Sequence, residues 1–143
     1  MLAILGGSGV SELANMQVTR RRVVRTPYGK PSGALVFGTL RGRKVVFLPR
    51  HGPAHTIPPH EVNYRANIWA LHAQKVTDVV SVASVGGIRA DLGPGTLVIP
   101  DQIIDYTHGR SSTFFTRGRG PVTHIDFTRP YCEALRQRLL KAA

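Results

Sequence analysis

An arginine and three histidines gather in one short stretch of the sequence. Arg50 and His51 follow directly on the apolar run KVVFLP, and His55 and His60 come within the next nine residues. A guanidinium can hold an oxyanion with two parallel hydrogen bonds, and an imidazole adds a donor that becomes cationic when protonated. The stretch therefore predicts a site for an anion such as phosphate, against the plainer interpretation of a surface loop.

The same histidines raise the alternative of a metal site. His51, His55 and His60 have the spacing H-x3-H-x4-H. This spacing lacks the H-E-x-x-H pattern that places two ligands on one helix face, and two prolines interrupt it. We therefore expect no metal here.

Two further loops carry small and hydroxyl residues after apolar runs. GGSG, at 6–9, follows the run LAIL and contains Ser8, while Ser84 lies near the end of the run DVVSVASV and precedes two glycines. Glycine lets a backbone approach a ligand closely, and backbone amides with a serine hydroxyl can cradle a phosphate, helped by the N-terminus of a helix expected after GGSG. The alternatives are a tight turn for GGSG and a small core residue for Ser84. GGSG fits neither the dinucleotide fingerprint nor the P-loop, and the sequence contains no G-x-S-x-G nucleophile elbow.

The pattern of apolar residues indicates how these loops are positioned. Strands alternate with helices, which predicts an α/β fold, and ligands in such sheets bind outside the carboxyl ends of the strands. The three loops are therefore expected to converge. The expected strands are 2–5, 17–25, a hairpin over 34–49 with the three-residue turn RGR, 78–85 as a central parallel strand, and 95–100; the expected helices lie within 58–75 and over 131–143.

Length and composition set the class of protein. The 143 residues have the size of one ordinary domain. No apolar run approaches the roughly 20 residues of a membrane span, and the N-terminus does not resemble a signal peptide. The single cysteine, Cys132, excludes an internal disulfide and fits a reducing compartment. We therefore expect a cytoplasmic protein that does not associate with membranes.

The charge is strongly basic, with 19 Lys and Arg against 8 Asp and Glu and a formal net charge of +11. Such a balance attracts polyanions, and nucleic acid is the obvious candidate. The basic residues are spread over 19–25, 41–44 and 117–120. Two alternatives explain the basic residues equally well: they lie on a solvated surface, or acidic residues outside this chain balance their charge. Because there is no aromatic stacking platform or groove-reading motif, we expect no nucleic-acid partner.

Several motifs together resemble one enzyme family. GGSG, TPYGKPSG, RHGPAHTIPPHEVNYRANIWAL, SVGGIRADLGPGTLVIPDQIIDYT and STFF are collinear with the purine nucleoside phosphorylase and methylthioadenosine phosphorylase family. SVGGI, IDYTHGR and THIDFTRPY look closest to its S-methyl-5′-thioinosine phosphorylase branch. The resemblance implies a three-layer α/β fold around a mixed sheet. It also implies that residues 1–143 are the N-terminal half of one larger phosphorylase domain.

The resemblance implies an activity as well. The family cleaves the N-glycosidic bond of a purine nucleoside with inorganic phosphate, through an oxocarbenium-like transition state that phosphate can stabilise and then attack. S-methyl-5′-thioinosine would give hypoxanthine and 5-methylthioribose 1-phosphate, a purine salvage reaction; methylthioadenosine or a general purine nucleoside is the alternative substrate. Phosphate is a co-substrate, and no cofactor is expected. Family members of this type are commonly homotrimers.

The family's phosphate contacts match five positions of this sequence: Ser8, Arg50, His51, Ala83 and Ser84. Ala83 departs from the adenosine-type pattern, which has a hydroxyl residue there. Side-chain donation at this position is therefore lost, although a backbone contact remains possible.

Two histidines match the pocket for the 5′-alkylthio group. His55 belongs to the Arg-His loop, and His124 resembles a residue contributed by a neighbouring subunit. The residue that protonates the leaving purine lies in the half that this sequence does not contain, so the catalytic residue is unknown. A catalytically incomplete fragment that binds phosphate is the competing hypothesis.

Overall fold

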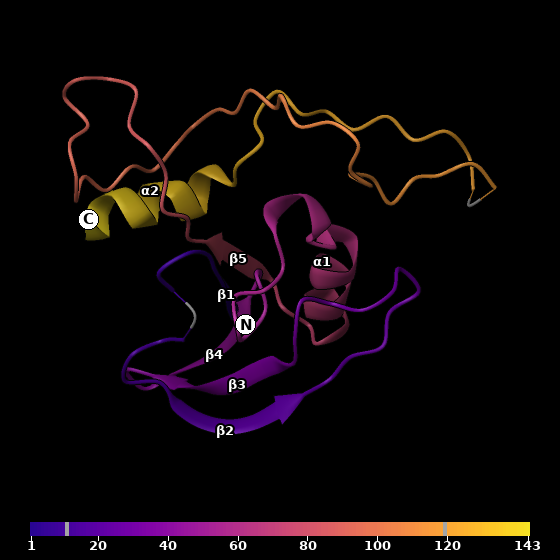
Figure 1. Cartoon of the computed structure of the whole chain (residues 1–143), viewed down its shortest axis with the longest axis horizontal. Helices are drawn as coiled ribbons and strands as arrows, with labels where there is room; N and C mark the ends of the chain where they lie inside the picture. The colour runs from indigo at the N-terminus through magenta and orange to yellow at the C-terminus, as the bar shows by residue number, and fades with distance from the viewer. Residues whose placement is uncertain (11, 119) are drawn as a thin grey trace. The chain divides into compact units, whose positions relative to one another are not determined.

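The computed structural model describes residues 1–10, 12–118 and 120–143 (Figure 1). Within these residues, five strands, one short 3-10 turn and two α-helices follow one another. They are β1 (Leu2–Gly6), β2 (Gln17–Arg22), β3 (Leu35–Leu40), β4 (Arg43–Pro49), η1 (Pro59–Glu61), α1 (Tyr64–Ala73), β5 (Asp78–Ser81) and α2 (Glu133–Ala142).

The five strands form one mixed sheet in the order β2-β3-β4-β1-β5. β1 pairs in parallel with β4 on one side and with β5 on the other, while β2–β3 and β3–β4 are antiparallel. The α/β class and the mixed sheet are therefore as expected. β5 is parallel as predicted, but it lies at the edge of the sheet and not at its centre.

The β3–β4 hairpin turns through two residues, Arg41 and Gly42, and not through the expected three. Both have positive φ, 46° and 77°. Positive φ at both central residues is the geometry of a type I′ turn, whose twist matches that of the flanking strands. Arg43 is therefore free to pair with Leu40 as the first residue of β4.

The core lies between α1 and one face of the sheet. Ala70 and Leu71 of α1 pack against side chains of β1, β3 and β4, and the single tryptophan, Trp69, lies partly buried against the same cluster. The other members of this cluster are Ala3, Leu5, Val24, Leu35, Phe37, Val46 and Leu48.

Helix α1 begins later than the expected helix because of a specific cap. The Asn63 side chain accepts a 3.0 Å hydrogen bond from the Ala66 amide, which satisfies one of the unpaired amides of the first turn. The prolines before it form only the short turn η1. Asn67, one turn further, is fully buried and bonded to Ser32: its Oδ1 accepts from the Ser32 amide at 2.8 Å, and its Nδ2 donates to Ser32 Oγ at 2.9 Å.

The chain divides into two compact units. The first comprises 1–84 and 110–114, and the second comprises 85–109 and 115–143. The expected strand over 95–100 does not form, and these residues are mostly exposed. A strand needs a neighbour to satisfy its backbone groups, and no described segment of the second unit pairs with this one.

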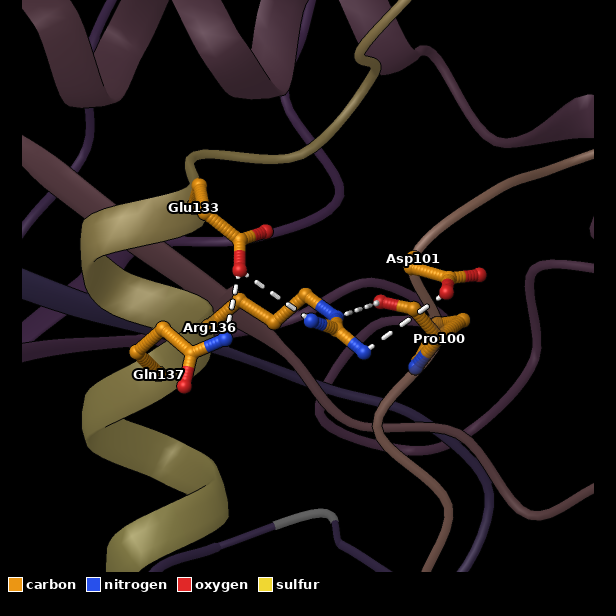
Figure 2. A network of polar contacts seen from close by, with 5 residues as sticks. All are labelled: Pro100, Asp101, Glu133, Arg136 and Gln137. Carbon is orange, nitrogen blue, oxygen red and sulfur yellow. Dashed lines mark hydrogen bonds and ion pairs between the residues drawn. The ribbon is translucent and has the colours of Figure 1, made fainter.

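Helix α2 is held within the second unit mainly by Arg136 (Figure 2). Its guanidinium donates to the Pro100 carbonyl at 3.2 Å and to Glu133 Oε1 at 3.2 Å, and lies 3.7 Å from an Asp101 oxygen. Gln137 donates to the same Glu133 oxygen at 2.6 Å. This hydrogen bond, with smaller contributions from nearby arginines, lowers the pKa of Glu133. Within the described residues, no helix has the length and apolar character needed to cross a membrane.

Candidate phosphate site

Three neighbouring parallel strands deliver the predicted residues to one edge of the sheet. β4 ends at Pro49 and leads into Arg50 and His51, β1 ends at Gly6 and leads into Ser8, and β5 leads towards Ser84. β1 lies between β4 and β5, and all three point the same way. The convergence predicted from the sequence is therefore present within the first unit.

Backbone hydrogen bonds continue beyond the regular strands and hold these ends in register. The Arg50 amide donates to the Gly6 carbonyl at 2.9 Å, and the Val82 amide donates to the Leu5 carbonyl at 2.9 Å. The loops thus leave the sheet from fixed positions, which is the condition for binding groups on loops to be well placed.

The Arg50 side chain crosses the end of β1. Its Nη1 donates to the Val82 carbonyl oxygen at 2.6 Å, and Val82 is the one hydrogen-bond partner of this guanidinium among the described residues. A guanidinium has five N–H donors, so several remain for a ligand. The bond to Val82 restricts the rotation of the side chain and therefore prepares it to bind an anion.

Gly7 is required by this crossing. A Cβ on Gly7 would overlap the Arg50 guanidinium and lie 2.6 Å from the Val82 carbonyl oxygen. The second glycine of GGSG therefore serves the packing of Arg50 against the loop, a role that the sequence does not reveal.

The two serines are joined to each other. Ser84 Oγ donates to the Ser8 carbonyl oxygen at 2.9 Å. A hydroxyl has one hydrogen to donate, and Ser84 already donates it to Ser8. Ser84 must therefore exchange this partner before it can donate to phosphate, whereas the Ser8 side chain is exposed beside the cavity.

His51 is buried at 7% exposure and borders a cavity of about 240 Å³. Its Nδ1 lies 2.9 Å from the Ile57 carbonyl oxygen. Because a carbonyl oxygen only accepts, Nδ1 carries the hydrogen, and Nε2 is the nitrogen left for a ligand. Nε2 is therefore the nitrogen of His51 through which a phosphate could be bound. The cavity is lined by Ser8, His51, His55, Thr56, Ile57, Pro58 and Pro59.

The cavity is small. Pockets for drug-sized molecules usually enclose about 300–1,000 Å³. The volume of about 240 Å³ lies below that range.

His55 lies beside His51, with their ring centroids 4.9 Å apart. His60 is separate from this pair, exposed and 3.7 Å from Glu61. Among the described residues, no three His, Cys, Asp or Glu side chains gather as a metal ion would require.

The remaining predicted residues do not contact the cavity. Ala83 is exposed between Val82 and Ser84. His124 belongs to the second unit, where it is exposed. Arg50 and Ser84 lie at the strand ends without lining the cavity itself. The helix expected after GGSG is absent from the described residues, so no helix N-terminus assists this loop.

Sequence reasoning missed the residues that support the TPYGKPSG loop. Asn63 Nδ2 donates to the Tyr28 carbonyl at 2.7 Å, in addition to capping α1. Asn67 holds Ser32 at the other end of the same loop. Two asparagines spaced four residues apart, Asn63 and Asn67, lie on one face of a helix that packs on the core. Because a buried amide needs hydrogen-bond partners, this spacing could have indicated that the helix holds a neighbouring loop.

Glycine, serine, arginine and histidine thus lie at the ends of adjacent parallel strands of a mixed α/β sheet, which is the place where ligands bind in open α/β sheets. The chain belongs to the phosphorylase superfamily, whose sequence pattern matches residues 1–143. This confirms the resemblance drawn from the motifs.

Individual relatives within the superfamily are similar to this chain over nearly all of its length. The chain is 48% identical over 140 residues to a probable S-methyl-5′-thioinosine phosphorylase of Pseudomonas syringae, covering 98% of this chain and 57% of the relative. It is 46% identical over 142 residues to S-methyl-5′-thioadenosine phosphorylase of Hyperthermus butylicus, covering 99% and 51%. Among solved structures, methylthioadenosine phosphorylase from Schistosoma mansoni in complex with adenine superimposes with a TM-score of 0.94 at 41% identity, covering 99% and 52%. The chain thus spans about half the length of the relatives that it matches.

Proposed function

We propose that this chain supplies the phosphate-binding half of a purine nucleoside phosphorylase, a pentosyltransferase of purine salvage. The reaction is phosphorolysis of S-methyl-5′-thioinosine to hypoxanthine and 5-methylthioribose 1-phosphate. The carbon–nitrogen bond at C1′ breaks, the purine leaves with the electron pair and takes up a proton, and a phosphate oxygen forms the new bond to C1′. Phosphate is the co-substrate, and the chemistry requires no other cofactor.

The observation that carries this proposal is the convergence of Ser8, Arg50, His51 and Ser84 at the ends of β1, β4 and β5. Arg50 places positive charge, and His51 a free ring nitrogen, where a phosphate dianion must be held. A dianion fixed beside C1′ stabilises the positive charge that develops on the ribose and is already positioned to attack. We assign the Ala83 amide as a backbone donor to the same phosphate.

The lining of the cavity favours a 5′-methylthio group. Ile57, Pro58 and Pro59 give it an apolar wall next to His55. Burying a hydroxyl without a hydrogen bond costs about 1–3 kcal/mol, whereas a thioether has no hydrogen to satisfy. We assign His55 to this 5′ pocket. His124 is assigned to the same pocket of an adjacent subunit in a cytoplasmic homotrimer.

Methylthioadenosine is the second candidate substrate. The relatives named for methylthioinosine and for methylthioadenosine are almost equally similar to this chain, at 48% and 46% identity. The motif similarity to the thioinosine branch makes the 6-oxopurine the first choice.

Two measurements test the proposal. Isothermal titration with inorganic phosphate should show saturable binding to the 143-residue chain, and an exposed-surface control, Arg43→Ala, should bind equally well. Cleavage of methylthioinosine and methylthioadenosine is then followed with and without phosphate. The expected result is release of hypoxanthine that requires phosphate. Absence of phosphate binding, or cleavage at the same rate without phosphate, would overturn the assignment. A chain that binds phosphate but cleaves neither nucleoside would instead be a phosphate-binding half-site.

A further inference from the structure

Two loops of the first unit lie against each other beside the cavity. One is the TPYGKPSG loop, and the other is the histidine loop, residues 51–57, which follows β4. A Cβ on Gly52 would lie 3.4 Å from the Ser32 carbonyl oxygen, and a Cβ on Gly33 would lie 3.4 Å from Cδ of Pro53. Because protein interiors are closely packed, a displacement of the TPYGKPSG loop changes the space available to the histidine loop.

His51 closes the histidine loop by two hydrogen bonds to one residue. Its Nδ1 donates to the Ile57 carbonyl oxygen at 2.9 Å, and the Ile57 amide donates to the His51 carbonyl oxygen at 3.0 Å. Gly52 lies between them in the chain with a φ of 78°, a left-handed conformation that glycine adopts without strain. A Cβ on Gly52 would also lie 3.4 Å from Ile57 Cδ1, so Gly52 faces both Ile57 and Ser32. A shift of Gly52 would therefore disturb the orientation of the His51 ring.

The TPYGKPSG loop is in turn held from helix α1. Asn67 binds both the amide and the hydroxyl of Ser32, and it has no exposed surface. Giving up either bond would leave a buried polar group without a partner, so the two bonds together define one position of Ser32. Ala70 and Leu71, on the next turn, fix the helix to the sheet. Contacts thus lead from the core through Asn67 and Ser32 to Gly52.

Filling the core does not account for an amide at position 67. An apolar side chain would occupy a fully buried position of α1 without requiring hydrogen-bond partners. Asn67 also does not line the cavity, so it does not act on a ligand directly. What the amide group does is hold a neighbouring loop in one place. Binding sites depend on such supports, because a small displacement of a binding group weakens its bond to the ligand.

We propose that Asn67 is a positioning residue of the candidate phosphate site. Through Ser32 it fixes the backbone at Gly52, and thereby the hydrogen bond between the His51 ring and Ile57. That bond keeps the hydrogen on Nδ1 and leaves Nε2 for the ligand. The identity of the ligand rests on the proposed function, whereas the effect on the ring is a property of the free chain.

The first measurement needs no phosphate. NMR of the ring nitrogens of His51, at a pH at which the ring is neutral, reports which nitrogen carries the hydrogen. The native chain should show the hydrogen on Nδ1. In Asn67→Ala this preference should be lost, because the ring no longer has an acceptor in a fixed place. Ser32→Ala keeps the bond from the backbone amide to Asn67, so it should show a smaller change, and it replaces Asn67→Ala if that variant does not fold.

Leu71→Ala is the matched control. Leu71 is 1% exposed, lies on the same helix and packs in the core against the sheet. Its truncation lowers stability without removing a hydrogen bond to the TPYGKPSG loop. All variants are compared at a temperature at which circular dichroism shows them folded. The control should keep the native signal of the His51 ring.

The second measurement is a titration with inorganic phosphate. Asn67→Ala should bind phosphate about tenfold more weakly, as expected when one hydrogen bond to a charged ligand is impaired, and Leu71→Ala should bind it as the native chain does. A native His51 signal in both Asn67→Ala and Ser32→Ala, an equal change in Leu71→Ala, or an altered ring with unchanged phosphate affinity would each overturn the proposal. A native chain that binds no phosphate would instead contradict the proposed function, and the ring measurement would still decide the role of Asn67.

Discussion

Arg50 donates a 2.6 Å hydrogen bond from Nη1 to the carbonyl oxygen of Val82, which joins the carboxyl end of β4 to that of β5 across β1. The bond fixes a cation over the glycine loop before any ligand arrives. The position of the Arg50 guanidinium therefore depends on the arrangement of β1, β4 and β5.

Two substitutions of Arg50 should therefore distinguish the contribution of its charge to phosphate binding from the contribution of its planar shape. Arg50→Ala is expected to weaken phosphate binding by at least tenfold, because hydrogen bonds to charged groups contribute about 1.5–3 kcal/mol. Arg50→Lys keeps the charge but loses the planar fork, and should give an intermediate loss. Titration calorimetry with phosphate measures both. Equal affinity for phosphate in Arg50→Ala and the native chain would exclude Arg50 from the site.

Gly7 should tolerate no side chain. Gly7→Ala forces Arg50 and Val82 apart, and overpacking of this kind costs about 1–3 kcal/mol. We expect a lower midpoint of thermal unfolding together with weaker phosphate binding. Gly86→Ala is the matched control, because its added methyl meets nothing within 4 Å. A Gly7→Ala protein as stable as this control would contradict the close packing of Arg50.

Substituting Asn67 should reduce the stability of the protein more than substituting its partner Ser32. Asn67→Ala leaves both the Ser32 amide and its hydroxyl without their partner, and each unsatisfied buried group costs about 1–3 kcal/mol. Ser32→Ala removes only the hydroxyl and should cost less. Urea unfolding of both variants and of the double variant measures the difference. Additive effects in the double variant would show that the two residues do not act as a pair.

The Glu133 carboxylate should titrate below the ordinary range of a glutamate. Its pKa is lowered by the hydrogen bond from Gln137 and by nearby arginines, so Gln137→Ala should raise it. A lowered pKa in the folded state means that the contribution to stability is present above the ordinary pKa and is lost as the pH falls through the folded value. A titration of Glu133 followed by NMR tests this, with Arg138→Ala on the same helix as control. The same pKa for Glu133 with and without Gln137 would argue against the contact.

The sequence predicted the convergence of the strand ends, but it did not predict the contacts that hold the side chains there in place. Adjacent parallel strands must bring their carboxyl ends together, so Ser8 and Arg50 could be placed near each other from patterns of apolar residues alone. The bond that holds Arg50, however, goes to a backbone carbonyl, which every residue has and no motif marks. Asn67 was missed because a polar residue interrupts the apolar pattern of a helix, although it is completely buried.

The expected strand over 95–100 failed for a different reason. Its sequence, GTLVIP, has the composition of a strand, but a strand forms only where a neighbour accepts its hydrogen bonds. The same reasoning explains β5, where the composition of a central strand is found at an edge. In both cases the local sequence has the composition of a strand. It does not indicate which segment, if any, lies beside that strand in the sheet.

Trp69 gives the molecule an internal optical label. It is the only tryptophan, and it packs against the core of the first unit, so its fluorescence senses the docking of α1 and not the state of α2. Emission and amide exchange in α2 can therefore follow the two units separately during unfolding. Coincident transitions would mean that the units melt as one cooperative body, and staggered transitions would identify the order in which they are lost.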